Sequence, residues 1–114
     1  MGLVTTPEPV RRILSDLLPL VREFARGDYA IALGGSYAKG TADREADVDL
    51  YLFAHAVLPR QERTRVASAF SPEVGSVVSW GDDIPFRDGG TDFRFGGHNV
   101  ECWLRDIGHI VPVE

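Results

Sequence analysis

Apolar residues recur at helical spacing in the N-terminal part of the chain. The stripe consists of Val10, Ile13, Leu14, Leu17, Leu18, Val21 and Phe24. Steps of three and four residues place these side chains on one face, which predicts a helix over residues 7–26. Thr5 or Thr6 can cap the start of this helix, and Gly27 can end it. Because Pro19 lacks a backbone N–H, we expect a kink or a break there.

The rest of the chain alternates short apolar runs with polar turns. The pattern predicts strands at 29–33, 48–53, 74–80, 91–95 and 98–104, a helical turn at 36–39, a helix at 59–70, and polar loops at 40–46 and 81–90. The last two strands flank Gly96-Gly97, which is typical of a tight hairpin. This order predicts one α/β or α+β domain over residues 1–114, with a mixed β-sheet flanked by helices.

Composition narrows the class of protein. The chain has 114 residues, 44% of them hydrophobic and 25% charged, which is ordinary for a soluble globular domain. The net charge of −5 disfavours a protein that binds DNA or RNA along the backbone, since such proteins carry a basic face. Arg60, Arg63 and Arg65 form the only basic cluster, and Glu62 interrupts it. We therefore expect a solvated helix face there. The net charge does not exclude a local site for one triphosphate, because the charge around such a site matters more than the total.

The sequence also bears on where the protein works. No apolar run approaches the ~20 residues needed to cross a bilayer, and no secretory signal begins the chain. Its single cysteine, Cys102, cannot form an internal disulfide, and we expect it to be a small buried hydrophobe. These features predict a cytoplasmic protein that does not bind membranes.

Candidate chemistry is concentrated between residues 33 and 52. Gly34 and Gly35 follow an apolar strand, and they allow the backbone to turn sharply and approach a ligand. Ser36 then begins a helical turn, where free N–H groups and a hydroxyl suit a phosphate. Asp47 and Asp49 are two apart on a strand, so both carboxylates project from one face and favour a divalent cation between them.

The combination of Gly35-Ser36, ten residues and Asp47-Val48-Asp49 resembles the nucleotidyltransferase signature of the DNA polymerase β-like superfamily. The resemblance implies a mixed sheet flanked by helices, with Ser36 at the β- and γ-phosphates. It further implies that three carboxylates bind two Mg²⁺ ions, for which Mn²⁺ can substitute. The reaction it implies moves a nucleoside monophosphate from a nucleoside triphosphate to a hydroxyl and releases pyrophosphate.

The third carboxylate of the superfamily lies on a later strand, and Glu101 is the candidate here. If Val100, Cys102 and Leu104 face the core, then Glu101, Trp103 and Arg105 share the opposite face. A surface position on a strand also explains Glu101. Lys39 and Arg44 flank the loop and could neutralise phosphate charge, although solvent exposure explains them equally well.

The hairpin followed by Trp103-Leu104-Arg105-Asp106 resembles a group of uncharacterised bacterial nucleotidyltransferases. In that group a helical domain follows, which implies that such a domain is missing from this chain. The leading expectation is therefore a transferase acting on a hydroxyl of a small molecule or protein. The alternative is a minimal nucleotidyltransferase-type antitoxin or a weakly catalytic regulatory module, for which a homodimer or a helical partner is expected.

Overall fold

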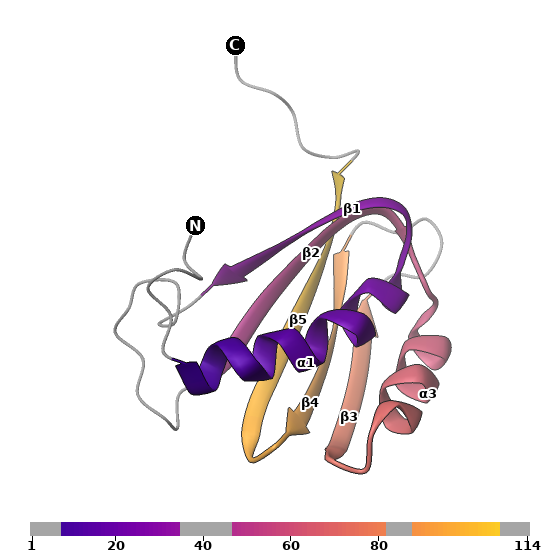
Figure 1. The fold of residues 1–114 in the computed structure, drawn as a ribbon. Helices are drawn as coiled ribbons and strands as arrows, with labels where there is room; N and C mark the ends of the chain where they lie inside the picture. The colour runs from indigo at the N-terminus through magenta and orange to yellow at the C-terminus, as the bar shows by residue number, and fades with distance from the viewer. Residues whose placement is uncertain (1–7, 35–46, 82–87, 108–114) are drawn as a thin grey trace.

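The computed structural model describes residues 8–34, 47–81 and 88–107, which form two helices and five strands. In chain order the elements are α1 (Glu8–Phe24), β1 (Ala25–Gly34), β2 (Val48–Val57), α3 (Arg60–Phe70), β3 (Val74–Gly81), β4 (Asp88–Phe95) and β5 (His98–Asp106) (Figure 1). The predicted elements are therefore present wherever they fall within the described residues.

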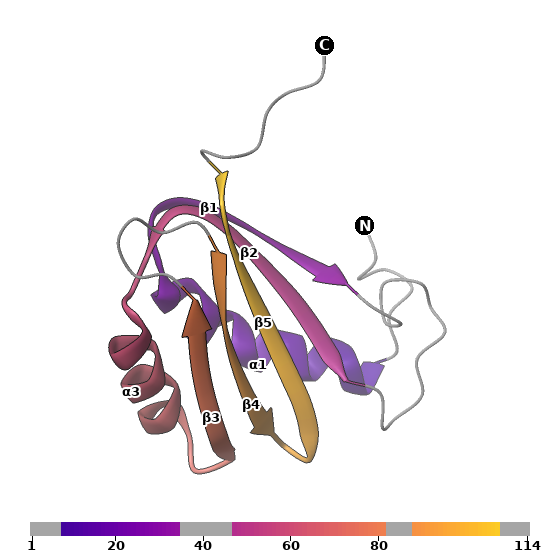
Figure 2. The same ribbon diagram turned by 180° about the vertical axis from the view of Figure 1, so that it is seen from behind.

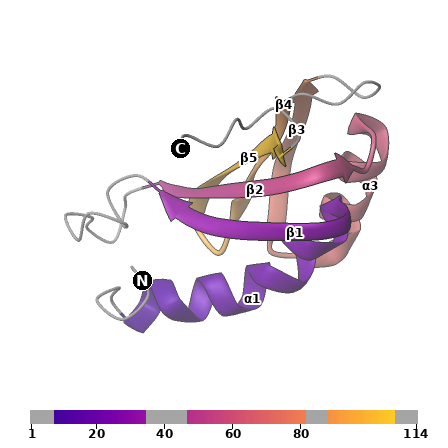
Figure 3. The same cartoon turned by 90° about the horizontal axis from the view of Figure 1, so that it is seen from above.

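The strands form one mixed sheet in the order β1-β2-β5-β4-β3. Strands β2 and β5 are parallel, whereas the other neighbouring pairs are antiparallel. Both helices cover one face of the sheet, and Figure 2 shows the opposite face toward the viewer. Seen from above, α1 runs alongside β1 (Figure 3). The predicted α+β class with a mixed sheet is confirmed.

The hydrophobic core lies between the helices and the sheet. It contains Leu14, Leu17, Leu20, Val21 and Phe24 of α1, together with Val48, Leu50, Leu52, Val100, Cys102 and Leu104 of the two parallel strands. The predicted stripe omitted Leu20, which is fully buried. Within the described residues, neither helix is long and apolar enough to cross a membrane.

Helix α1 differs from the prediction at two points. Of the kink or break predicted at Pro19, the break is absent: the helix continues through the proline, and Leu17, Leu20 and Val21 on either side of it are fully buried and hold the backbone against the sheet. It also ends at Phe24, two residues earlier than predicted. Gly27 does not cap the helix: it has a φ of +80° and lies in the irregularity between Arg26 and Tyr29 in the β1–β2 register.

Arg63 contradicts the prediction of a solvated arginine cluster on α3. Its side chain is fully buried, one helical turn before the buried Ala67. The guanidinium donates to Thr91 Oγ1 at 3.0 Å, to the Leu58 carbonyl at 2.7 Å and to the Trp80 carbonyl at 2.8 Å. Arg63 therefore fastens α3 to β3 and β4. The other two members of the predicted cluster, Arg60 and Arg65, are exposed as expected, and Arg65 forms an exposed ion pair with Glu62.

The predicted loop over residues 81–90 also needs a correction, since its last three residues belong to β4. Gly89 and Gly90 are buried there, each opposite β3. A Cβ on Gly89 would meet the Trp80 carbonyl oxygen, and one on Gly90 would meet the Trp80 indole. The two glycines therefore mark a close approach of Trp80 to the strand rather than a turn.

We predict that Arg63→Met destabilises the domain by about 3 kcal/mol, because the change strands buried carbonyl oxygens that the guanidinium now satisfies. Urea unfolding at neutral pH measures the loss. Arg65→Met is the matched control, since the same chemical change falls on an exposed side chain of the same helix. Equal unfolding midpoints for the two variants would contradict a structural role for Arg63.

Candidate functional site

Three carboxylates lie in one row across the face of the sheet that the helices leave open. Asp49 on β2 is the register partner of Glu101 on the parallel strand β5. Glu101 is in turn the register partner of Asp92 on β4. The strand order places β2, β5 and β4 side by side (Figure 2). The register therefore puts the three residues in adjacent positions. Two of the predicted site residues are thereby brought together, and Asp92 joins them.

Strand alternation explains why acids are on this face. Along β2, Val48, Leu50 and Leu52 are buried in the core, while Asp49 and Tyr51 between them are only partly buried. Strand β5 repeats the pattern. The prediction that Val100, Cys102 and Leu104 face the core and that Glu101, Trp103 and Arg105 share the other face is confirmed by their burial.

Cys102 behaves as the small buried hydrophobe that the sequence predicts. Its side chain is fully buried on the core side of β5. Burial raises the pKa of the thiol to about 12, so the reactive thiolate is suppressed at neutral pH. Cys102 therefore does not serve as a nucleophile at the acidic site, which lies on the other face of the sheet.

Asp47 stands just before β2 and is held by the β4–β5 hairpin. Asn99 Nδ2 donates to Asp47 Oδ1 at 3.1 Å. Arg94 donates to Asn99 Oδ1 at 2.7 Å and to the Gly97 carbonyl at 2.8 Å. Because Arg94 occupies the amide oxygen, the amide nitrogen of Asn99 is directed at Asp47. The side chain of Asp47 is thus oriented through two hydrogen bonds in series, as carboxylates at metal sites commonly are.

Two acids of the row, Glu101 and Asp92, have raised pKa values. The pKa of Glu101 is raised, first by burial, then by a hydrogen bond with Asp49 and by the charges of Asp49, Asp92 and Asp47. The pKa of Asp92 is also raised by burial and by the charge of Asp49, although a hydrogen bond from Trp80 acts in the opposite direction. Crowded carboxylates of this kind favour a proton or a cation between them.

The donor set at this row suits a hard divalent cation. Asp49 Oδ1 is buried and has no hydrogen-bond partner in the structure, so one carboxylate oxygen has no other ligand. Carboxylate oxygens are the ligands that Mg²⁺ prefers. Among the described residues, however, no three His, Cys, Asp or Glu side chains form a ready-made metal cluster. The fit therefore rests on the adjacent Asp49 and Glu101, with Asp47 held close to them by Asn99.

The predicted phosphate-binding residues Gly35, Ser36, Lys39 and Arg44 lie outside the described residues. Their connection to the site is nevertheless defined at both ends. Gly34, the last residue of β1, pairs with Asp49, and Asp47 directly precedes β2. Gly34 and Asp47, the described residues on either side of these four, therefore lie beside the row of acids.

Sequence reasoning missed Asp92, Asn99 and Arg94. Each faces its partner because of the hairpin at Gly96-Gly97, whose φ values of +56° and +84° fit a two-residue type I′ turn. Such a turn pairs Phe95 with His98 and, counting outward, Asp92 with Glu101. The hairpin register could have been predicted from Gly96-Gly97, and it would have identified Asp92, Arg94 and Asn99 as neighbours of the site.

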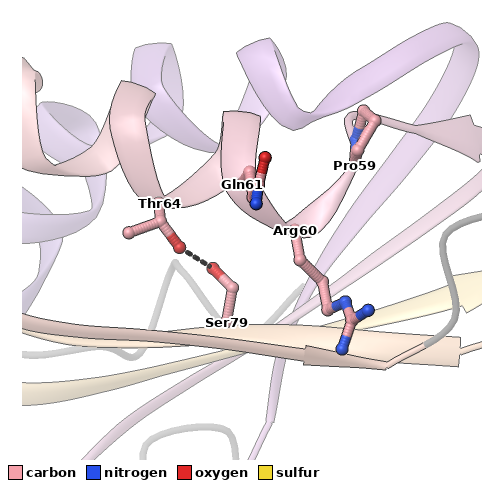
Figure 4. A pocket seen from close by; sticks show the side chains of 5 residues that line it. All are labelled: Pro59, Arg60, Gln61, Thr64 and Ser79. Atoms are coloured by element: carbon pink, nitrogen blue, oxygen red, sulfur yellow. Dashed lines mark hydrogen bonds between the residues drawn. The ribbon is translucent and has the colours of Figure 1, made fainter.

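A pocket elsewhere on the molecule does not belong to this site. It is lined by Pro59, Arg60, Gln61, Thr64 and Ser79 at the start of α3 (Figure 4). A hydrogen bond of 2.8 Å joins Thr64 to Ser79, which is on the helix side of β3. None of the carboxylates of the row lines this pocket.

The raised pKa of Glu101 predicts a pH-dependent stability in the absence of metal. Below its ordinary pKa of 4.5 Glu101 is protonated in both the folded and the unfolded state, so Glu101→Gln should change stability little. Above that pH the folded state holds the proton more tightly than the unfolded state, and the wild type should lose stability relative to Glu101→Gln until the raised pKa is passed. Thermal unfolding with EDTA from pH 4 to 8 tests this. Glu73→Gln, in an exposed turn, should show no such trend.

Comparison with known proteins identifies the family of the chain. A family model described as the nucleotidyltransferase domain matches residues 10–88, more than half of the chain. The match includes Ser36, Asp47 and Asp49 and ends before Glu101. A search of curated proteins found no match. The family predicted from the motif is confirmed, and the chain belongs to the nucleotidyltransferase domain family.

Proposed function

We propose that this domain transfers a nucleoside monophosphate, with the help of divalent metal, from a nucleoside triphosphate to a hydroxyl of a small molecule or protein. The observation that carries the proposal is the pairing of Asp49 with Glu101. The two residues are register partners on parallel strands, and Asp49 is close enough to raise the pKa of the Glu101 carboxyl. The family match supports nucleotidyl transfer in general, and this pair supplies the acidic centre that the reaction needs.

The residues would divide the work by position. Asp47 and Asp49, next to the segment that carries Ser36, would hold the cation that accompanies the triphosphate. Glu101, one strand farther from that segment, would complete the site for a second cation beside the acceptor. Gly35 and Ser36 would bind phosphate oxygens through backbone N–H groups and a hydroxyl, and Lys39 and Arg44 would neutralise their charge.

The chemistry is an in-line displacement at the α-phosphorus. A bond forms between the acceptor oxygen and that phosphorus, the bond to pyrophosphate breaks, and the acceptor proton is released. Bound divalent ions, Mg²⁺ or Mn²⁺, would supply charge stabilisation and a more acidic acceptor hydroxyl. The protein's own share is positioning: Asn99 orients Asp47, and the β2–β5 register sets Asp49 against Glu101.

We predict that ATP or another nucleoside triphosphate stabilises the folded domain only when Mg²⁺ or Mn²⁺ is present. Without metal the row of acids should repel the triphosphate. At ~100 times its dissociation constant, the nucleotide should add about 2.7 kcal/mol to the free energy of unfolding. Thermal shift over a nucleotide panel measures the effect. Equal stabilisation in EDTA would exclude a metal-bridged triphosphate.

We further predict that the acids separate into two roles. Asp49→Asn should weaken metal-dependent nucleotide binding by roughly tenfold or more and abolish transfer, because it removes a ligand of the cation that carries the triphosphate. Glu101→Gln should keep nucleotide binding within about threefold of wild type but lose transfer, because only the acceptor side is altered.

Nucleotide titration and pyrophosphate release over a panel of hydroxyl compounds separate these two effects. Asp28→Asn is the control, since it makes the same charge change at an exposed position of the edge strand β1. If Glu101→Gln transferred at the wild-type rate, Glu101 would be a surface residue of the strand and would have no part in the site.

A further inference from the structure

The open face of the sheet carries a row of aromatic side chains next to the row of acids. Tyr51, Trp103 and Trp80, which we call the aromatic shelf, extend from β2 across β5 and β4 to β3. The Tyr51 and Trp103 rings have centroids 6.3 Å apart and planes at 16°, and Trp80 meets Trp103 edge-on at 5.4 Å. Along β2 and β5 the shelf lies two residues beyond Asp49 and Glu101, on the same face.

Two glycines let the shelf lie close to the sheet. A Cβ on Gly34 would collide with the Tyr51 ring, and a Cβ on Gly90 would collide with the Trp80 indole. Each ring therefore covers a position without a side chain on the neighbouring strand. Both helices of the described part of the chain pack on the other face, so no described helix covers these rings. Aromatic side chains beside a few polar groups are typical of the lining of small-ligand sites.

Asp92 is at the junction of the two rows. It neighbours Glu101 across the β4–β5 register, and the Trp80 side chain is close enough to lower the pKa of its carboxyl, against the raising effect of burial. It is an acid in addition to Asp47, Asp49 and Glu101, and it lies on the side of Glu101 away from Asp49. Asp92 is therefore placed on the acceptor side of the proposed reaction, away from the segment that would hold the triphosphate.

We propose that the aromatic shelf and Asp92 form the acceptor subsite and select a hydroxyl compound that carries an ammonium group. The inference rests on the proposed function and names the substrate class of the same site. A carboxylate beside aromatic rings is the combination that recognises an ammonium ion, through a charge-assisted contact and cation–π attraction. With the ammonium at Asp92, the hydroxyl would reach Glu101 on the next strand.

The register also limits the length of this acceptor. Neighbouring strands are about 4.8 Å apart, so Asp92 and Glu101 are spaced for an ammonium and a hydroxyl separated by about two or three carbons. Arg105, two residues beyond Trp103 on β5, lies on the side of the shelf away from the acids, with its guanidinium carbon over the Trp103 ring at 5.5 Å from the centroid. Its positive charge repels a second cation from that end and directs an ammonium group toward the acids.

The chain contains two tryptophans, and both belong to the shelf, so intrinsic fluorescence reports directly on it. The probes are choline and 3,3-dimethylbutan-1-ol, which have the same shape but differ in the charge of the central atom. In EDTA and without nucleotide, we expect choline to change the tryptophan emission saturably and the neutral alcohol to bind at least about tenfold more weakly, because it lacks the cation–π and ionic contacts. Equal response to both probes, or to neither, would overturn the proposal.

Asp92→Asn should remove the preference for choline. Asp28→Asn should keep it, because this substitution makes the same charge change on the edge strand β1, away from Asp92 on β4. Preference retained in a folded Asp92→Asn variant would count against the subsite. The comparison of the two probes on the unaltered protein needs no variant and stands if Asp92→Asn does not fold. Because neither measurement involves nucleotide or metal, failure here is distinct from failure of the metal-dependent nucleotide binding that tests the proposed function.

Discussion

The parallel pairing of β2 with β5 is the constraint on which the site depends. A parallel pair joins segments that are distant in sequence, and here it places the strand that begins within the Asp47-Val48-Asp49 motif beside the last strand of the described chain. Both strands bury one face in the core, so their register is fixed by packing: a slip of one residue would turn Leu50 and Cys102 outward and Asp49 and Glu101 inward. The position of the acids is thus enforced by the hydrophobic core on the opposite face.

Local patterns predicted much of this arrangement. The alternation along residues 98–104 correctly divided β5 into a core face and an open face, and the Gly96-Gly97 turn correctly marked the hairpin. What the sequence could not supply was the neighbour of β2. About fifty residues separate Asp49 from Glu101, and only the packing of intervening elements decides that β5 rather than β3 or β4 lies beside β2. The hairpin register, by contrast, was readable, and it would have paired Asp92 with Glu101.

Arg63 shows a different limit of sequence reasoning. An arginine among other charged residues on a helix is usually solvated, and composition alone favoured that interpretation. The structure buries it because α3 packs against the β3–β4 pair, where the carbonyl oxygens of Trp80 and Gly90 need donors, and the carbonyl of Leu58 just before the helix accepts from the same guanidinium. The sequence of residues 60–70 does not predict those acceptors, which lie as far as 27 positions from Arg63 along the chain.

The same hydrogen bonds connect the stability of the fold to the open face. Trp80 and Gly90 are register partners, and Arg63 donates to the carbonyl oxygens of both from the helix side. The Trp80 indole then lies over Gly90 on the other side of the sheet, against Trp103 and Asp92. A buried cation beneath the sheet therefore fixes the backbone pair that carries one end of the aromatic shelf. Weakening that anchor should loosen the shelf and Asp92 while leaving the β2–β5 pair, and with it Asp49 and Glu101, in register.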